Sequence, residues 1–440
     1  MIQTMYADHV QQLMQRCGSL LEQEGFDGLL IHSGRPSYHF LDDYTQAYKP
    51  NPHFVHWVPF LADYPDGWLF IVPDRKPVLA IYSPDDFWHI TPEMPNEFWC
   101  EHFDIRLYSD RATVLKEIMM GKRIALIAEQ LCEVIGSELT HNPTTLMQHL
   151  HYYRAYKTPW EQACIREANR TAVKGHHYLA QAFEEPLSEY QLHQGYLTAI
   201  GHQEGQLPYN NIIGLNEHAA VLHYQHKSHQ PPSVRRTLLA DAGAVYQGYV
   251  ADITRTISQG SHLFHYLIEQ MDIAQQLIVA EVKPGVSFVA LHEAMHRRLF
   301  TILAASGIVR QPEQISSADA LAITRTFYPH GLGHLLGIQV HDIGGWQTDL
   351  FGSQTAPPEN HPYLRLTRNL EADFVVTIEP GLYFIPSLLG ELKQHSVKGH
   401  IDWHLVEQLT PWGGIRIEDN VCVLPEGVEN YTRDAFNALQ

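Results

Sequence analysis

Two aspartates stand in a stretch of sequence that is otherwise largely apolar. In LLADAGAVYQGYVADITRTI, residues 238–257, two strand-like segments flank a tight Tyr-Gln-Gly turn, and each segment carries one aspartate, Asp241 or Asp252. Burying a carboxylate among leucine, valine and isoleucine is costly unless a partner compensates its charge. The stretch therefore predicts a cation beside these two side chains.

The geometry of a hairpin decides whether one cation could serve both aspartates. A turn centred on Gln247 and Gly248 places Asp252 opposite Gly243, two residues from Asp241 on the same face. The carboxylates are then diagonal neighbours, with Cα atoms about 7–8 Å apart and side chains able to converge. A three-residue turn would instead put them on opposite faces.

An arginine is the alternative to a metal ion between the two carboxylates. Three arginines are near in sequence, namely Arg235, Arg236 and Arg255. Arg255 alternates away from Asp252 along the strand, which weakens this alternative without removing it.

Three further segments offer metal-binding side chains. Glu379 ends the apolar strand-like segment 375–378. In GGIRIEDN, strand alternation puts Arg416 and Glu418 on one face and the isoleucines on the other. PHGLGH offers a histidine, His334, in a segment whose two glycines and lack of the HExxH glutamate favour a loop over a helix. Each of these has an ordinary alternative explanation, as a solvated strand end, a simple ion pair or a turn residue.

Together these side chains form an oxygen-rich group of two aspartates, two glutamates and one histidine. Such a group can share carboxylates between two ions, and it favours manganese, cobalt or zinc over a metal bound through thiolates. The five cysteines are scattered and form no CxxC pair (Cys17, Cys100, Cys132, Cys164 and Cys422). They predict neither a disulfide framework nor a zinc knuckle, and they suggest a reducing compartment.

The chain that must position these residues is long enough for two domains, with 440 residues. Residues 1–156 alternate helix-like and strand-like segments and predict an α/β domain with a mixed sheet. An amphipathic helix opens it, and buried strands are expected at 28–31, 68–72 and 78–82. Residues 157–440 form the second expected domain. There a capping box at Thr158–Glu161 opens a helix that runs to about Phe183, and Ser188 to Gln191 offers a second capping box. Further helices are expected near 265–280 and 287–306. The C-terminal quarter is predicted to be β-rich.

The composition excludes several classes of partner. Lysine and arginine total 30 against 49 acidic residues, a formal net charge of −19, which argues against nucleic acid and anionic membrane. The N-terminal segment lacks the pattern of a signal peptide, and no run of 18 apolar residues predicts a membrane span, so we expect a cytoplasmic protein. The 29 histidines are unusually many, and we expect most to be surface or structural residues.

The order of the motifs resembles a known family. Asp241, ten intervening residues, Asp252, then HGLGH, TIEPGLY and GIRIEDN are similar to the dinuclear "pita-bread" metallopeptidases. Within them the chain resembles bacterial Xaa-Pro dipeptidases (prolidases) of the organophosphorus acid anhydrolase type. The likeness extends to FLDD at 40–43, DFWH at 86–89 and HYYRAYKT at 151–158.

The resemblance implies a complete metal site. Asp252 and Glu418 would bridge two divalent ions, Asp241 would bind one of them, and His334 with Glu379 would complete the other. No ligand position is substituted. We expect two ions per subunit, with Mn²⁺ as the first choice. Because similar proteins are homodimers, the resemblance also implies a homodimer.

The expected reaction is metal-assisted hydrolysis of the bond before a C-terminal proline, with organophosphorus P–F and P–O hydrolysis as a side activity. A hydroxide formed between the two ions would attack, and Glu379 is our choice for the proton shuttle. His223 and His341 would donate hydrogen bonds, and Arg416 would bind the free carboxylate of a dipeptide. We assign further substrate contacts to the residues Tyr209, His330, Trp88 and Asp43, the last two reaching a neighbouring subunit's pocket.

Two other functions remain open at this point. Aminopeptidase P would use identical ligands on longer peptides, and a non-catalytic binding protein could keep the same fold. Methionine aminopeptidase is disfavoured because that reaction does not need the N-terminal domain.

Overall fold

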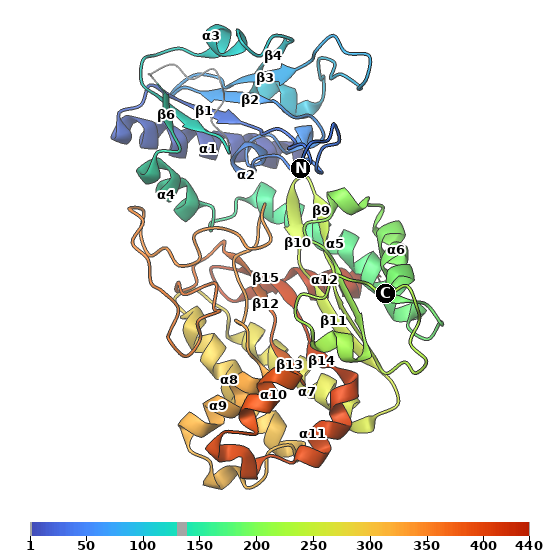
Figure 1. Ribbon diagram of the computed structural model, residues 1–440. Helices are drawn as coiled ribbons and strands as arrows, with labels where there is room; N and C mark the ends of the chain where they lie inside the picture. Colours follow the sequence, from blue (N-terminus) through green and yellow to red (C-terminus); the bar gives the residue numbers. More distant parts are fainter. Residues whose placement is uncertain (1, 130–138, 440) are drawn as a thin grey trace. The chain divides into compact units, whose positions relative to one another are not determined.

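A computed structural model describes residues 2–129 and 139–439 of the chain (Figure 1). It contains two compact units. Unit 1 comprises residues 1–154, 158–163 and 349–353, and unit 2 comprises residues 155–157, 164–348 and 354–440. Cys132 lies outside the described residues.

Unit 1 is built on one mixed sheet of six strands in the order β4-β3-β2-β1-β5-β6. The β1/β2 and β2/β3 pairs are antiparallel, whereas β1/β5, β3/β4 and β5/β6 are parallel. This confirms the predicted mixed α/β architecture. Its strands and helices are β1 (Gly28–His32), β2 (Trp68–Ile71), β3 (Val78–Tyr82), β4 (Asp104–Tyr108), β5 (Ile124–Ile127), β6 (Leu139–His141), α1 (Ile2–Glu24), α2 (Pro52–Val55), α3 (Val114–Ile118) and α4 (Thr144–Tyr153).

The three strands predicted for unit 1 are buried over nearly their whole length, as their continuous apolar runs indicate. Helix α1 is amphipathic as expected, with Val10, Leu13 and Cys17 buried at helical spacing.

Unit 2 packs helices and short sheets around a large apolar core. Its sheets have the orders β11-β8-β7, β12-β15-β16, β10-β9 and β13-β14. Its elements are α5 (Pro159–Ala182, which begins in unit 1), α6 (Glu189–Ile200), β7 (Ile212–Leu215), β8 (Thr237–Asp241), β9 (Ala244–Tyr246), β10 (Tyr249–Ala251), β11 (Thr254–Ser258), α7 (His262–Glu281), α8 (Phe288–Ala305), α9 (Ser317–Phe327), β12 (Val375–Ile378), β13 (Gly381–Tyr383), α10 (Pro386–Leu392), α11 (Trp403–Leu409), β14 (Gly414–Arg416), β15 (Asp419–Val423), β16 (Val428–Asn430) and α12 (Tyr431–Leu439).

Both predicted capping boxes are present at the starts of α5 and α6. The Thr158 amide donates to Glu161 Oε2 at 2.8 Å, and the Glu161 amide donates back to the Thr158 hydroxyl at 3.4 Å. Ser188 and Gln191 make the reciprocal pair before α6. These bonds satisfy backbone donors that a helix start leaves open, so the local sequence is enough to place both starts.

The aspartate hairpin has the register that the two-residue turn predicts. Tyr246 pairs with Tyr249 across the turn, and the same register continues to Asp241 opposite Thr254. Gln247 and Gly248 both have positive φ, 47° and 76°, as the tight turns of hairpins require.

The C-terminal quarter is less β-rich than predicted. It holds the short strands β12 to β16, but also α10, α11 and α12, and residues 328–374 form a long irregular segment. Apolar residues of this segment, such as Leu332, Leu335 and Leu364, pack into the core without belonging to any of the named strands. None of the helices described is long and apolar enough to cross a membrane.

Candidate metal centre

We call the five predicted metal-binding residues the ligand set: Asp241, Asp252, His334, Glu379 and Glu418. All five belong to unit 2.

Thr254 joins the hairpin to Glu418, which directly precedes β15. Asp241 ends β8 opposite Thr254 in β11, and Thr254 also forms a bridge with Glu418. The Thr254 hydroxyl donates to Glu418 Oε2 at 2.7 Å. Asp252 is held from behind by Asn420, whose side chain accepts from the Asp252 amide at 3.0 Å and donates to its carbonyl at 2.5 Å. Hydrogen bonds thus hold the backbone of Asp241 and Asp252 and the carboxylate of Glu418.

The HGLGH loop, residues 330–334, runs antiparallel to β12 and so brings its histidine to the strand end. The Glu379 amide donates to Leu332 O at 2.8 Å, and the Thr377 amide donates to His334 O at 3.0 Å. His334 Nε2 lies 3.4 Å from Glu379 Oε1. The segment is a loop, as its glycines predict, and it positions a ligand because it pairs with a strand.

The hydrogen bonds of His334 orient it for metal binding. Its Nδ1 bonds to Leu335 O at 3.0 Å, and because a carbonyl only accepts, Nδ1 carries the proton. The lone pair of the neutral ring is then on Nε2, which lies 3.5 Å from Asp252 Oδ2. A backbone acceptor at the far nitrogen is the usual arrangement for a metal-binding histidine.

The electrostatics of the ligand set call for positive charge. Asp252, His334 and Glu418 are buried and each offers an atom within 4.8 Å of the other two. Burial raises the pKa of Glu418 well above its ordinary value, and the charges of Asp252, Glu379 and Asp241 raise it further. Burial likewise raises the pKa of Glu379 to about 7, against the lowering effect of His334.

Two buried oxygens of the ligand set lack the partner that a bound cation would supply. Within the described part of the chain, Asp252 Oδ1 and Glu418 Oε1 are buried and have no hydrogen-bond partner. A buried carboxylate oxygen without a partner costs free energy that a bound divalent ion would offset. Four carboxylates and one imidazole are also the donors that hard or borderline divalent ions prefer.

Arg416 is the arginine that pairs with the hairpin, and it comes from β14, far away in sequence. It donates to Asp241 Oδ2 at 2.7 Å, to the Tyr383 hydroxyl at 2.9 Å and to the Thr254 hydroxyl at 3.3 Å. Arg255, near in sequence, bonds to Asp419 instead. The sequence left a metal ion and an arginine as alternatives. The structure places an arginine beside Asp241, whereas Asp252 Oδ1 has no hydrogen-bond partner among the described residues.

Two residues assigned to substrate contact in the sequence lie in the wall of this centre. The Tyr209 hydroxyl donates to Asp241 Oδ1 at 2.8 Å, so Tyr209 contacts a predicted metal ligand. His330 Nδ1 bonds to Gly331 O at 2.9 Å, and its Nε2 lies 2.8 Å from the Tyr383 hydroxyl. A hydrogen-bonded chain therefore runs from Asp241 through Arg416 and Tyr383 to His330.

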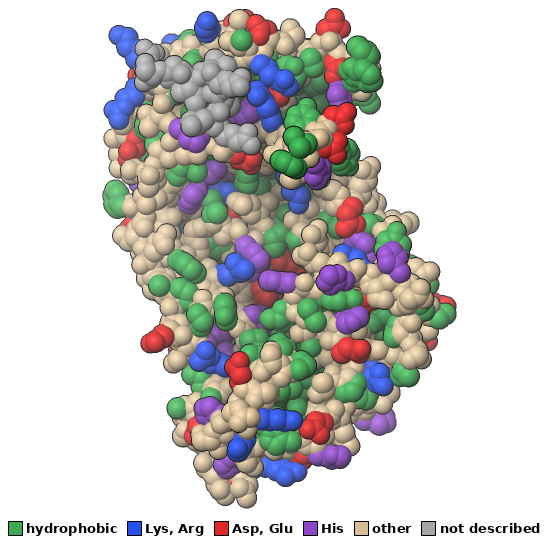
Figure 2. Space-filling model, viewed as in Figure 1, with side chains coloured by type: hydrophobic (Ala, Val, Ile, Leu, Met, Phe, Trp, Pro, Cys, Tyr) green, Lys and Arg blue, Asp and Glu red, His purple; other side chains and the backbone are tan. Residues whose placement is uncertain are grey.

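The other predicted residues lie nearer to solvent. The His341 ring meets the edge of His334 at 4.5 Å between centroids. Desolvation lowers the pKa of His341, and the charges of His334 and Arg365 lower it further. Arg365 is therefore close enough to His341 to act on it electrostatically. His223 is exposed and acts electrostatically on His330 and on His341. Figure 2 shows histidine side chains gathered around a small acidic area on one face of the molecule.

Trp88 and Asp43 belong to unit 1, where both are exposed. They do not belong to the same compact unit as the ligand set.

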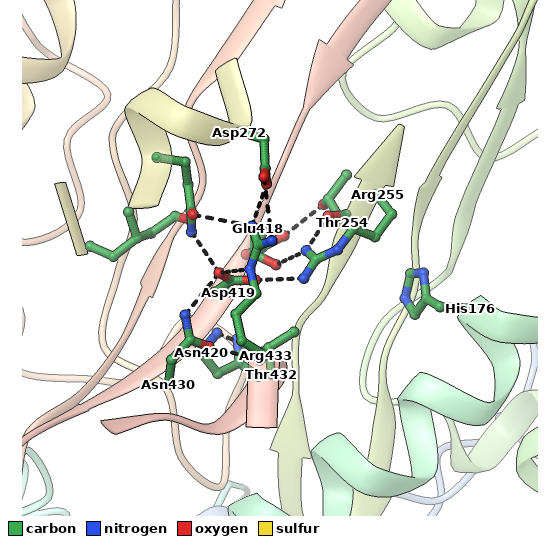
Figure 3. A network of polar contacts seen from close by, with 12 residues as sticks. His176, Thr254, Arg255, Asp272, Glu418, Asp419, Asn420, Asn430, Thr432 and Arg433 are labelled. Atoms are coloured by element: carbon green, nitrogen blue, oxygen red, sulfur yellow. Dashed lines mark hydrogen bonds and ion pairs between the residues drawn. The ribbon is translucent and has the colours of Figure 1, made fainter. Parts of the chain in front are cut away.

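A buried polar network lies behind Glu418 (Figure 3). Arg255 donates to Glu418 O at 2.8 Å and to Asp419 Oδ1 at 2.7 Å. Arg433 donates to Asp419 Oδ2 at 2.8 Å and also pairs with Asp272. The two arginines hold the pKa of Asp419 at about 2, against the effect of its burial.

The sequence analysis missed Tyr383, Thr254, Asn420 and Asp419 as parts of the site. All four stand in motifs that the sequence analysis quoted: Tyr383 in TIEPGLY, Asp419 and Asn420 in GIRIEDN, and Thr254 in the hairpin stretch. Their roles depend on contacts with residues far away in sequence, which no local pattern indicates.

Comparison with known proteins agrees with this geometry. Residues 4–152 match the family described as "Xaa-Pro dipeptidase, N-terminal domain", and residues 163–425 match "Metallopeptidase family M24". A protein of Shewanella pealeana named Xaa-Pro dipeptidase is 45% identical over 433 residues, covering 98% of both chains. One of Proteus mirabilis with the same name is 42% identical over 440 residues, again covering 98% of each.

Solved structures show the same fold at low identity. Aminopeptidase P of Escherichia coli in complex with substrate, as a single-residue variant, superimposes with a TM-score of 0.74 at 21% identity, covering 97% of this chain and 95% of the other. The zinc-substituted form of that enzyme in complex with product gives a TM-score of 0.73 at 20% identity, covering 98% of both chains.

The fold and the oxygen-rich centre are those of a metal-dependent peptidase with the pita-bread architecture, whose family implies a dinuclear site for divalent ions. The chain belongs to metallopeptidase family M24, and within it to the bacterial Xaa-Pro dipeptidases, or prolidases.

Proposed function

We propose that the chain hydrolyses dipeptides with a C-terminal proline. It would use two divalent ions held by the ligand set, with Mn²⁺ as the first choice of metal. The observation that carries the proposal is the convergence of Asp252, His334, Glu379 and Glu418, with Asp241 linked to Glu418 through Arg416 and Thr254. The chain also resembles Xaa-Pro dipeptidases along 98% of its length. We assign the catalytic part to residues 157–440. The ions, when bound, lower the pKa of a water molecule and stabilise developing negative charge.

The chain's own residues would do the rest of the work. Glu379 stands at the edge of the ligand set, 3.4 Å from His334, where it can accept the proton of the attacking water and pass it to the leaving nitrogen. His223 and His341 would donate hydrogen bonds to the substrate. His330 would line the substrate site, because its two ring nitrogens are engaged by Gly331 O and the Tyr383 hydroxyl. Proline needs a dedicated enzyme because its amide nitrogen is tertiary and carries no hydrogen.

Two arginines are candidates for binding the substrate carboxylate. Arg416 was assigned this role from the sequence, but its side chain is 5% exposed and all three of its nitrogens donate within the site. A substrate carboxylate would have to replace Asp241 at Arg416 Nη2. Arg365 is exposed and its charge reaches His341, so it could bind the carboxylate without giving up a ligand contact.

The test compares dipeptides and a tripeptide. Metal-stripped protein is assayed on Ala-Pro, Leu-Pro and Ala-Pro-Ala before and after Mn²⁺ is added, with Asp252→Asn as the inactive variant and the exposed Asp63→Asn as its matched control. We expect Mn²⁺-dependent cleavage of the dipeptides only, lost by at least about 100-fold in Asp252→Asn and kept in Asp63→Asn. Arg365→Ala and Arg416→Lys in the same assay identify the carboxylate-binding arginine by which of them raises KM for Ala-Pro.

Other outcomes of this assay point to the alternatives. Cleavage of Ala-Pro-Ala would assign the activity to aminopeptidase P. Failure on all three peptides with metal bound would indicate a non-catalytic binding protein on the same fold.

A side activity on phosphorus esters is part of the same proposal, because a centre that stabilises attack on a carbonyl also suits attack on a tetrahedral phosphorus with a good leaving group.

We propose a homodimer as the active form and the cytoplasm as the compartment.

A further inference from the structure

Three buried histidines outside the ligand set converge in the helical part of unit 2. His292 and His296 lie one turn apart on α8, and His361 comes from the irregular segment 328–374. Their exposed fractions are 1%, 4% and 7%. One nitrogen of each lies within 4.8 Å of the other two, and the ring centroids are 4.3–4.9 Å apart. We call these three residues the histidine cluster.

The hydrogen bonds around His296 show which of its ring nitrogens carries the lone pair. Its Nδ1 lies 2.9 Å from the Thr324 hydroxyl, and that hydroxyl donates to Leu321 O at 3.1 Å. A hydroxyl has one hydrogen, so Thr324 accepts from His296 Nδ1–H. The lone pair of the neutral ring is then on Nε2, which is the arrangement in which protein acceptors orient metal-binding histidines.

The other two rings share a single hydrogen bond and leave a polar atom without a partner. His292 Nε2 lies 2.9 Å from His361 Nδ1, so one of these nitrogens donates and the other accepts. Within the described residues, His292 Nδ1 is buried and has no hydrogen-bond partner. A buried polar atom of this kind is rare in a folded protein and calls for a partner such as an ion.

The surroundings keep the three rings neutral, so that protons do not compete for the lone pairs. Burial lowers the pKa of His292 well below its ordinary value and that of His296 to about 3, and it lowers that of His361 as well. Two charged side chains act on His361 in opposite directions, Arg325 lowering its pKa and Glu293 raising it. Neutral imidazole is the form that binds metals.

The donor chemistry selects the ion. Histidines four residues apart on one helix face are a recurring pair of zinc ligands, and a third imidazole with one open position completes a common four-coordinate site. Three nitrogens without a carboxylate suit Zn²⁺ or Cu²⁺ better than Mn²⁺, which prefers oxygen. Zn–N bonds of about 2.0–2.1 Å hold tetrahedral ligand nitrogens roughly 3.4 Å apart, and one nitrogen of each ring already lies within 4.8 Å of the other two.

We propose that the histidine cluster is a third metal site, separate from the ligand set, that binds one Zn²⁺ per chain. The bound ion cross-links α8 to the irregular segment that also carries the HGLGH loop. Tyr328 stands between the two regions, with its ring 4.9 Å from both His296 and His330. The ion therefore stabilises the wall behind the candidate substrate site without contacting the ligand set.

The experiment counts zinc in the full-length protein. Metal-stripped chain is saturated with Zn²⁺, passed through a desalting column with a weak chelator, and analysed by mass spectrometry of the metals. We expect three equivalents in wild type, two in His361→Gln and in His296→Gln, and three in the control His404→Gln, an exposed histidine on α11. Removing one ligand weakens binding of the third ion by at least about 100-fold.

Two further readouts guard against misfolded variants. Cu²⁺ added to wild-type protein that already holds Mn²⁺ in the ligand set should give an electron paramagnetic resonance spectrum with nitrogen couplings, and the melting temperature should rise on adding Zn²⁺ in wild type but not in His361→Gln. A zinc count that is the same in wild type and in both cluster variants would overturn the proposal. Because these readouts do not involve peptide hydrolysis, they are independent of the dipeptidase proposal.

Discussion

At the scale of single residues, side chains that are not expected to bind a metal ion hold the metal-binding residues in position. Asp419 is fully buried one position after Glu418 and accepts hydrogen bonds from Arg255, Arg433 and Gln275. Because Arg255 also donates to the Glu418 carbonyl, the network fixes the backbone from which that ligand projects (Figure 3). Removing one partner of a buried charged network leaves the others uncompensated, which is strongly destabilising.

We predict that Asp419→Asn destabilises the protein by at least about 2 kcal/mol near neutral pH, since the carboxyl pKa falls from 3.8 to about 2 on folding. A folded-state pKa below the unfolded value means that the carboxylate stabilises above pH 3.8, and that this stability is lost as the pH falls through about 2. Urea unfolding of metal-stripped wild type and variant should therefore show a constant difference above about pH 5 that narrows below pH 4. A difference that is independent of pH down to 3 would contradict the assignment, and Asp63→Asn serves as the exposed control.

At the scale of elements, the HGLGH loop acts as an added strand beside β12. Gly333 approaches the strand so closely that a Cβ there would lie 2.0 Å from Thr377 O. The neighbouring atom is backbone within a sheet and cannot move aside as a flexible side chain would. The close approach allows His334 and Glu379 to lie 3.4 Å apart.

We predict that Gly333→Ala pushes the loop away from β12, destabilises the protein by about 1–3 kcal/mol and weakens metal binding at the ligand set. The matched control is Gly390→Ala in α10, where a Cβ meets no heavy atom within 4 Å and a small stabilisation is expected. Thermal unfolding and metal titration of both variants give the comparison. Equal behaviour of the two variants would show that the loop tolerates the extra atom.

At the scale of the whole molecule, unit 1 exposes apolar side chains on the two segments that carry Asp43 and Trp88. Phe40, Leu41 and Ile90 are each at least 90% exposed, and Phe87 and Trp88 are 86% and 76% exposed. Monomeric proteins seldom leave contiguous apolar side chains in water, and such patches mark interfaces. Their coincidence with Asp43 and Trp88 supports the proposed homodimer, in which these residues would complete a neighbouring subunit's site.

We predict that the double substitution of Phe40 and Leu41 by serine raises the dissociation constant of the dimer by at least about tenfold, because each buried apolar side chain contributes about 1.5–3 kcal/mol. Sedimentation velocity over a range of concentrations measures this shift. Leu277→Ser, at a half-exposed position of α7, is the control and should leave the dimer intact. Wild-type protein that sediments as a monomer at every concentration would refute the homodimer.

By itself, the sequence determined whatever depends on short-range pattern. The mixed sheet of unit 1, both capping boxes, the register of the aspartate hairpin and the loop at His334 all follow from side-chain periods, turn residues and glycines that act over a few positions. The order of motifs was also enough to indicate the family and the ligand set.

Only the tertiary structure decided which distant residues meet. It showed that Arg416 rather than Arg255 pairs with the hairpin, that Tyr383 links Arg416 to His330, and that His361 joins His292. In the C-terminal quarter, part of the sequence that was expected to be β-rich forms helices and an irregular segment instead. These outcomes depend on packing between elements far apart in the chain, where burial and hydrogen bonding outweigh local preference.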